Sequence, residues 1–160
     1  MKGCLADPDS FRPDALTWAE DARALLARHC HYALIPSDNN ETCAKGIFRA
    51  KIEMISEADV VIANLNPCRG CEPNSGTCFE TGGAIALDKQ VIAYLADTRP
   101  QLDKLAEFYG GPLRRRDGRM VDPDGLMIEN FGLPINLTLG VFCQIFQGGL
   151  EDAVLELTVE

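Results

Sequence analysis

The chain has 160 residues, of which 46% are apolar and 24% are charged, proportions that are ordinary for one globular domain. Its formal net charge is −9, and a field of that sign repels polyanions such as nucleic acid at long range. No stretch reaches the roughly 18 uninterrupted apolar residues of a membrane-spanning helix, and the N-terminus lacks the apolar start of a signal peptide. We therefore expect one cytoplasmic domain over residues 1–160. We expect it to have no membrane partner and no nucleic-acid partner.

The first half of the chain alternates short apolar runs with segments of helical periodicity. Residues 3–6 form a short apolar run that predicts a first strand, and residues 14–28 carry apolar side chains at helical spacing. Residues 33–35 predict a second strand and residues 47–58 a second helix. The β-branched run at 60–65 is typical of a strand buried on both faces of a parallel sheet.

The second half continues this alternation. Its patterns predict a loop at residues 66–75 and a helix at 76–87. They then predict a strand at 91–95 and a helix at 100–108. Residues 109–125 are rich in glycine, proline and charge, which indicates a mobile loop or lid, and their Arg114-Arg115-Arg116 cluster is interpreted as a solvated loop. Pro134 is expected to begin a short helix, followed by a fifth strand at 141–146 and a last helix at 150–157.

Alternating strands and helices predict an α/β fold with a parallel sheet and helices on both faces. Five strands favour the flavodoxin-like doubly wound order. Ligands bind such sheets at the carboxyl ends of the strands, near the point where the strand order reverses. The loop that follows Leu65 leaves such an end, so we expect the chemistry of the protein in the segment after it.

The seven cysteines are an odd number, which does not suit a disulfide framework. Cys68 and Cys71 form a CxxC pair, with Cys78 close behind. A zinc site needs about four ligands, and a redox CxxC usually opens a helix, which Glu72-Pro73 delays here. We therefore interpret these residues as free thiols and expect no metal and no cofactor, with a cysteine-based metal or redox module as the alternative.

Glu80 is the candidate catalytic residue in the segment after Leu65. Ser75-Gly76-Thr77 is expected to open a helix, capped by Ser75 or Asn74, so Glu80 lies in the first turn or just past it. The positive end of the helix dipole favours an ionised carboxylate there, and such a carboxylate can attack an anomeric carbon. In the alternative interpretation Glu80 completes a capping box with Thr77, and the residues alone leave both interpretations open.

Several segments, in order along nearly the whole chain, resemble the nucleoside 2-deoxyribosyltransferase family. They are LADP at residues 5–8, EMISEADVVIANLNP at 53–67, SGTCFE at 75–80 and ENFGLPINL at 129–137. The likeness is greatest to the purine-preferring branch. It implies a flavodoxin-like fold and a homo-oligomer with shared active sites.

The resemblance also implies a double displacement in which Glu80 attacks C1′ of a 2-deoxynucleoside, the base leaves, and a free nucleobase then attacks the glycosyl-enzyme. Asn74 stands at the family's base-handling position. Asn136 corresponds to a residue that reaches into the site of a neighbouring subunit, although it could also be a polar residue in the first turn of a helix. The other residues implied to bind substrate are Asp7, Phe11, Asn64, Arg69, Ser75, Gly76 and Thr138.

The chain departs from the family pattern at five positions. Asn74 replaces an aspartate, and an amide cannot supply a titrating proton. The other four departures are Asp7 in place of glycine, Lys51 in place of asparagine, Gly83 in place of an aromatic residue and Thr138 in place of methionine. Two alternatives therefore remain: a nucleoside or nucleotide N-glycosidase, which passes the same intermediate to water, and a catalytically impaired nucleoside-binding member of the family.

Overall fold

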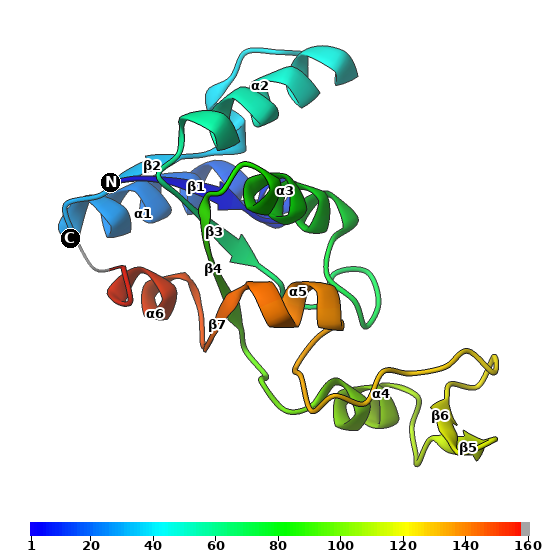
Figure 1. Cartoon of the computed structure of the whole chain (residues 1–160). Coiled ribbons are helices and arrows are strands. Elements are labelled where there is room, and N and C mark those ends of the chain that lie inside the picture. The colour runs from blue at the N-terminus through cyan, green and yellow to red at the C-terminus, as the bar shows by residue number, and fades with distance from the viewer. Residues whose placement is uncertain (158–160) are drawn as a thin grey trace.

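A parallel sheet organises the chain. In the computed structural model, which describes residues 1–157, five strands pair in the order β2-β1-β3-β4-β7, and every neighbouring pair is parallel (Figure 1). The strands are β1 (Lys2–Ala6), β2 (Tyr32–Leu34), β3 (Val60–Asn64), β4 (Gln90–Leu95) and β7 (Gln144–Gln147). This is the doubly wound order that the sequence predicted.

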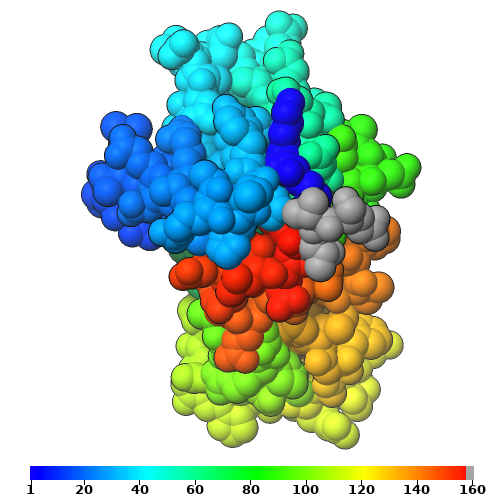
Figure 2. All heavy atoms as spheres, turned by 90° about the vertical axis from the view of Figure 1, so that its left-hand side faces the viewer, coloured from blue at the N-terminus to red at the C-terminus, as the bar shows by residue number. Residues whose placement is uncertain are grey.

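Helices cover both faces of this sheet. The helices are α1 (Ala15–Arg28), α2 (Ala44–Glu57), α3 (Ser75–Ala86), α4 (Gln101–Phe108), α5 (Leu137–Phe142) and α6 (Leu150–Leu155). The helices α2, α3 and α5 pack on one face, whereas α1 and α6 pack side by side on the other (Figure 2). Among the described helices, none is both long and apolar enough to cross a bilayer.

The strand β3 shows why these residues form a two-sided core. Successive side chains of a strand point to opposite faces. Val61 and Ala63 therefore belong to the core under α2 and α3, while Val60 and Ile62 belong to the core under α1 and α6. All four side chains are buried, which confirms the prediction of a strand covered on both faces.

The end of the chain corrects one predicted strand. The run at 141–146 was predicted as the fifth strand, with a helix from Pro134, but α5 begins at Leu137 and continues to Phe142, and β7 begins only at Gln144. Leu139 is buried while Val141 and Phe142 are exposed, a pattern of helical packing. A short apolar run fits either structure by its periodicity, and here the cap described below for Asn136 favours the helix.

Residues 109–125 are more ordered than predicted. They contain a hairpin of β5 (Arg114–Arg116) and β6 (Arg119–Val121), which pair antiparallel. Asp117 and Gly118 form its turn with φ of 48° and 80°. Two positive φ angles are typical of a type I′ turn, for which Asp-Gly is a favoured pair. The arginines of β5 are exposed, as predicted.

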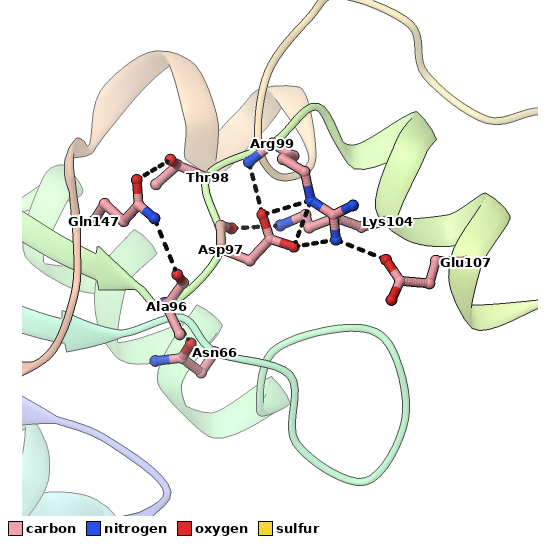
Figure 3. A network of polar contacts seen from close by, with 8 residues as sticks. All are labelled: Asn66, Ala96, Asp97, Thr98, Arg99, Lys104, Glu107 and Gln147. Carbon is pink, nitrogen blue, oxygen red and sulfur yellow. Dashed lines mark hydrogen bonds and ion pairs between the residues drawn. The ribbon is translucent and has the colours of Figure 1, made fainter.

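A polar network ties together the carboxyl ends of β3, β4 and β7 (Figure 3). The Asn66 side chain accepts a hydrogen bond from the backbone N–H of Ala96 at 2.8 Å. The carbonyl of Ala96 accepts one from Gln147 Nε2 at 3.5 Å. The loop that leaves β4 is braced by the ion pair of Arg99 with Asp97 at 2.6 Å. The edge of the sheet where ligands are expected is therefore held by side chains as well as by strand pairing.

The packing of α1 on the sheet generates the first prediction. Leu26 is fully buried between α1 and the sheet, whereas Leu16 on the same helix is exposed. We expect Leu26→Ala to lower the free energy of unfolding by about 2–5 kcal/mol, because it removes buried apolar contacts and leaves a cavity. The matched control Leu16→Ala should change it by less than about 0.5 kcal/mol. Urea denaturation followed by circular dichroism measures both, and equal effects would contradict the assigned core.

Candidate active site

The strand order reverses between β1 and β3, and the candidate site lies beside this point. The connection after β1 runs to α1 on one face of the sheet, and the connection after β3 runs to α3 on the other. Chains that diverge in this way leave a crevice at the carboxyl ends of the two strands. The residues that follow β1, Asn64 at the end of β3 and the first turns of α3 lie at this end of the two strands.

Asn74 is the N-cap of α3. Its side-chain oxygen accepts hydrogen bonds from the backbone N–H groups of Gly76 at 2.9 Å and Thr77 at 3.3 Å. Ser75 is therefore the first helical residue, and Glu80 is the sixth residue of α3 (Ser75–Ala86). A capping box requires its acidic residue at the third position, so the structure excludes that interpretation of Glu80.

The carboxylate of Glu80 forms an ion pair with Lys51. Glu80 projects from α3, and Lys51 projects from α2, which packs against α3. The Glu80 side chain is 6% exposed and that of Lys51 is 27% exposed. A charge with so little access to water needs a partner within the protein, and the ammonium group of Lys51 both balances the carboxylate and orients it. In the sequence, Lys51 stood out only because it replaces the asparagine of the family pattern, and its contact with Glu80 was not predicted.

Asp7 follows β1 and is 4% exposed. Its Oδ1 accepts a hydrogen bond from the backbone N–H of Asp9 at 2.9 Å, and its Oδ2 is buried without a hydrogen-bond partner. Burial, together with the negative charges of Asp9 and Glu80, raises the pKa of Asp7 to about 7, against the lowering effect of backbone N–H donors. Asp7 is therefore protonated in a large share of molecules at neutral pH.

The loop after Asp7 is held to the sheet by Asn64. The Asn64 side chain donates to Asp9 Oδ2 at 2.8 Å, and its oxygen accepts from the backbone N–H of Asn66 at 3.1 Å. The same loop, which includes the short helix η1 (Asp9–Phe11), presents Phe11 at the surface. The guanidinium carbon of Arg69 lies 5.3 Å from the centre of the Phe11 ring. Phe11 and Arg69, both predicted to bind substrate, are thus brought together as a flat surface.

The Glu80 side chain lines a groove of about 480 Å³ between α2 and α3. Gly76 and Lys51 also line it, and its remaining walls are apolar side chains. These are Ala44, Ile47, Phe48, Ile52 and Phe79. The rings of Phe48 and Phe79 lie 5.9 Å apart, and both are exposed. Neither residue was predicted to be part of the site, because two apolar residues on separate helices give no signal of their own in one sequence.

Asn136 and Thr138 lie beside a different cavity, which they line together with Ser75, Cys78 and Gly82. The Asn136 side chain caps α5 by accepting from the backbone N–H of Thr138 at 2.9 Å, and its Nδ2 lies 3.4 Å from the carboxylate of Glu129. Glu80 lines the groove between α2 and α3. A single chain therefore places Glu80 and Asn136 on separate cavities, and the cap explains Asn136 within its own subunit.

The cysteines after β3 are free thiols. Burial raises the pKa of both Cys71 and Cys78, which disfavours the thiolate that metal binding and redox chemistry require. Cys68 instead accepts a weak hydrogen bond from Asn74 Nδ2 at 3.9 Å. In the part of the chain that the structure describes, no three His, Cys, Asp or Glu side chains are grouped to hold a metal ion.

Comparisons with known proteins identify the family and the fold of the chain. A family model described as nucleoside 2-deoxyribosyltransferase matches residues 4–138. A solved structure of a 2-desoxiribosyltransferase from Leishmania mexicana is similar to this chain, with 38% sequence identity and a TM-score of 0.76. The match covers 92% of this chain and 90% of that one. A 2-deoxyribosyltransferase from Bacillus psychrosaccharolyticus shares the fold at 23% identity and a TM-score of 0.50, over 59% of this chain and 72% of that one.

No curated protein sequence gives a significant match. The family match extends from the middle of β1 into α5, and so includes the loop after β1, both helices that border the groove, and Glu80. Together with the likeness to the Leishmania enzyme, which extends over most of both chains, it shows that the chain belongs to the nucleoside 2-deoxyribosyltransferase family.

Proposed function

We propose that the protein transfers 2-deoxyribose between nucleobases through a covalent glycosyl intermediate on Glu80. The observation that carries this proposal is the placement of the Glu80 carboxylate, which lies beside the switch point of the sheet and on the wall of a groove with otherwise apolar surroundings. Its substrates are a 2′-deoxynucleoside and a free nucleobase, and membership of the family supports this substrate class.

In the first displacement, a Glu80 oxygen attacks C1′ and the base departs with the electrons of the glycosidic bond. The sugar passes through a state that resembles an oxocarbenium ion, which a nearby carboxylate stabilises. Lys51 then faces an uncharged ester in place of its ionic partner. Because Lys51 stabilises the free carboxylate, it favours the second displacement, in which an incoming base attacks C1′ and restores Glu80.

The base is expected to stack near Phe11 and Arg69, whose contact forms a flat surface beside the site. Asn74 can offer its amide N–H to a base edge, since its oxygen is occupied by the cap of α3. We propose that the base is a purine, which the likeness of the motifs to the purine-preferring branch supports.

The apolar groove favours transfer over hydrolysis, because its apolar walls offer few hydrogen bonds that would hold a water molecule in position to attack the ester on Glu80. With deoxyinosine alone we therefore expect little release of hypoxanthine, and with added adenine we expect deoxyadenosine and hypoxanthine to form together. Chromatography of the two mixtures measures this. Base release that does not depend on adenine would identify a hydrolase instead, and binding without turnover would identify a nucleoside-binding protein.

The role of Glu80 generates a direct test. Glu80→Gln keeps the shape of the side chain but removes the nucleophile, so we expect base exchange to fall by roughly 10³-fold or more, with no deoxyribosyl adduct on the protein in mass spectrometry. The matched control is Glu53→Gln, an exposed position on α2, which should retain full activity. An active Glu80→Gln protein with a normal circular dichroism spectrum would overturn the assignment.

We also propose that the protein is a homo-oligomer in which Asn136 of one subunit completes the site of its neighbour. One support is that Asn136 and Glu80 line separate cavities within one chain. The other is that apolar side chains are exposed both near Glu80 and near Asn136. Phe48 and Phe79 are exposed beside Glu80, and Leu126 and Phe131 are exposed on the segment that leads to Asn136.

Mixing two inactive variants tests this shared site. Asn136→Ser keeps a capping oxygen for α5 but removes the amide, and Glu80→Gln removes the nucleophile. If the subunits pair at random across a twofold interface, co-refolding equal amounts should restore roughly a quarter of wild-type activity, because one site of each mixed dimer is intact. Mixtures that stay as inactive as their parents, with mixed dimers shown by native mass spectrometry, would contradict the proposal.

A further inference from the structure

A base that leaves C1′ carries away an electron pair, and it leaves more readily when one of its ring nitrogens is protonated at the same time. Proton donation of this kind typically contributes about 10²–10⁴-fold to a rate. If the protein has the proposed function, on which this inference rests, a group of the site has to supply this proton.

Most polar groups of the site are unsuited to that role. Asn74 does not titrate, and its oxygen already caps α3. Lys51 is bound to Glu80, the nucleophile itself. Asp9 accepts from Asn64 through Oδ2 at 2.8 Å and pairs with an arginine through Oδ1 at 3.4 Å, so both of its oxygens are already engaged by other protein groups.

Asp7 differs from all of these because one of its oxygens is free. Oδ1 is bound by the backbone N–H of Asp9, but Oδ2 is buried and has no donor. A buried carboxylate oxygen without a hydrogen bond is costly, and protonation relieves that cost. The proton of Asp7 is therefore placed on Oδ2, where no other protein group of the described chain engages it.

Asp7 also shares its surroundings with the nucleophile. The helices α2 and α3, which carry Lys51 and Glu80, both pack against β1, and the charge of Glu80 contributes to the raised pKa of Asp7. As Glu80 gives up its charge to the bond with C1′, its repulsion of the Asp7 carboxylate disappears. The loss of the Asp7 proton thus becomes easier at the moment at which the base needs it.

The remaining titratable groups around Asp7 do not supply a competing proton or charge. Burial raises the pKa of Cys4, on β1, to about 12, and burial likewise raises the pKa of Tyr94, on β4. Both groups therefore stay neutral near pH 7. Arg12 pairs with Asp9 and Asp14 rather than with Asp7.

We propose that Asp7 is the proton donor of this site. In the first displacement the bond between C1′ and the base breaks, a bond between C1′ and a Glu80 oxygen forms, and the proton on Asp7 Oδ2 moves to a ring nitrogen of the base. The products are a neutral base, an ionised Asp7 and the glycosyl ester. In the second displacement the incoming neutral base attacks C1′ and returns a proton to Asp7, while Glu80 leaves as a carboxylate.

The proposal predicts a particular pH dependence. Because the protonated form of Asp7 is the donor, release of the first base in a single turnover should be fast below the pKa of Asp7, about 7, and should fall as the pH rises through it. Asp7→Asn keeps an acceptor for the Asp9 N–H but cannot lose a proton. We expect it to slow this step by about 10²–10⁴-fold and to abolish the decline between about pH 5 and about pH 9.

A substrate that needs no proton separates this role from a structural one. The base of 7-methyl-2′-deoxyguanosine already carries a positive charge, so it leaves C1′ without protonation. Asp7→Asn should therefore release it at close to the wild-type rate while it releases guanine from deoxyguanosine slowly. The control Asp103→Asn, at an exposed position of α4, should behave as wild type with both substrates.

Equal losses with both substrates, or no loss with either, would overturn the role of Asp7. If Asp7→Asn does not fold, the wild-type profile decides, since single-turnover base release that does not fall through about pH 7 contradicts the proposal. Failure of the proposed function would look different, because wild-type protein would then show no base exchange with any deoxynucleoside.

Discussion

A carboxylate that is almost entirely withdrawn from water has to find its compensation inside the protein, and for Glu80 that compensation comes from Lys51. The requirement links two helices that are separate in sequence. The cap of Asn74 sets where α3 begins and therefore which side chain of α3 faces α2. The packing of α2 on α3 and on β1 then brings the ammonium group to the carboxylate. Lys51 and Glu80 both line the otherwise apolar groove between these helices.

How far the sequence determines this arrangement depends on the distance over which each interaction acts. The buried strand β3 and the start of α3 were predictable, because their signals are local: a β-branched run in the first case, and Asn-Ser-Gly-Thr in the second, which left the cap open between Asn74 and Ser75. The boundary between α5 and β7 was not, since one apolar run satisfied both periodicities. The hairpin was missed although Asp117-Gly118 is a recognisable turn pair.

Contacts between distant residues needed the three-dimensional structure. Lys51 and Glu80 are 29 positions apart, and nothing in the periodicity of either helix indicates that the two side chains meet. The separation of Asn136 from Glu80 within one chain was likewise invisible, because a capping role and a role in a neighbouring site make the same demand on residue type. The raised pKa of Asp7 arises from burial, which depends on the packing of the whole sheet.

The hairpin that follows α4 has a further consequence. In the described residues its two strands pair with each other, as a sheet separate from the five-stranded one. Its turn is exposed at the tip of the hairpin. A tip attached in this way can accept added residues without shifting the register of the strands that carry the site. The turn between Arg116 and Arg119 is therefore the natural point at which a fluorescent label or a fused domain could be inserted while the crevice beside β1 and β3 keeps its geometry.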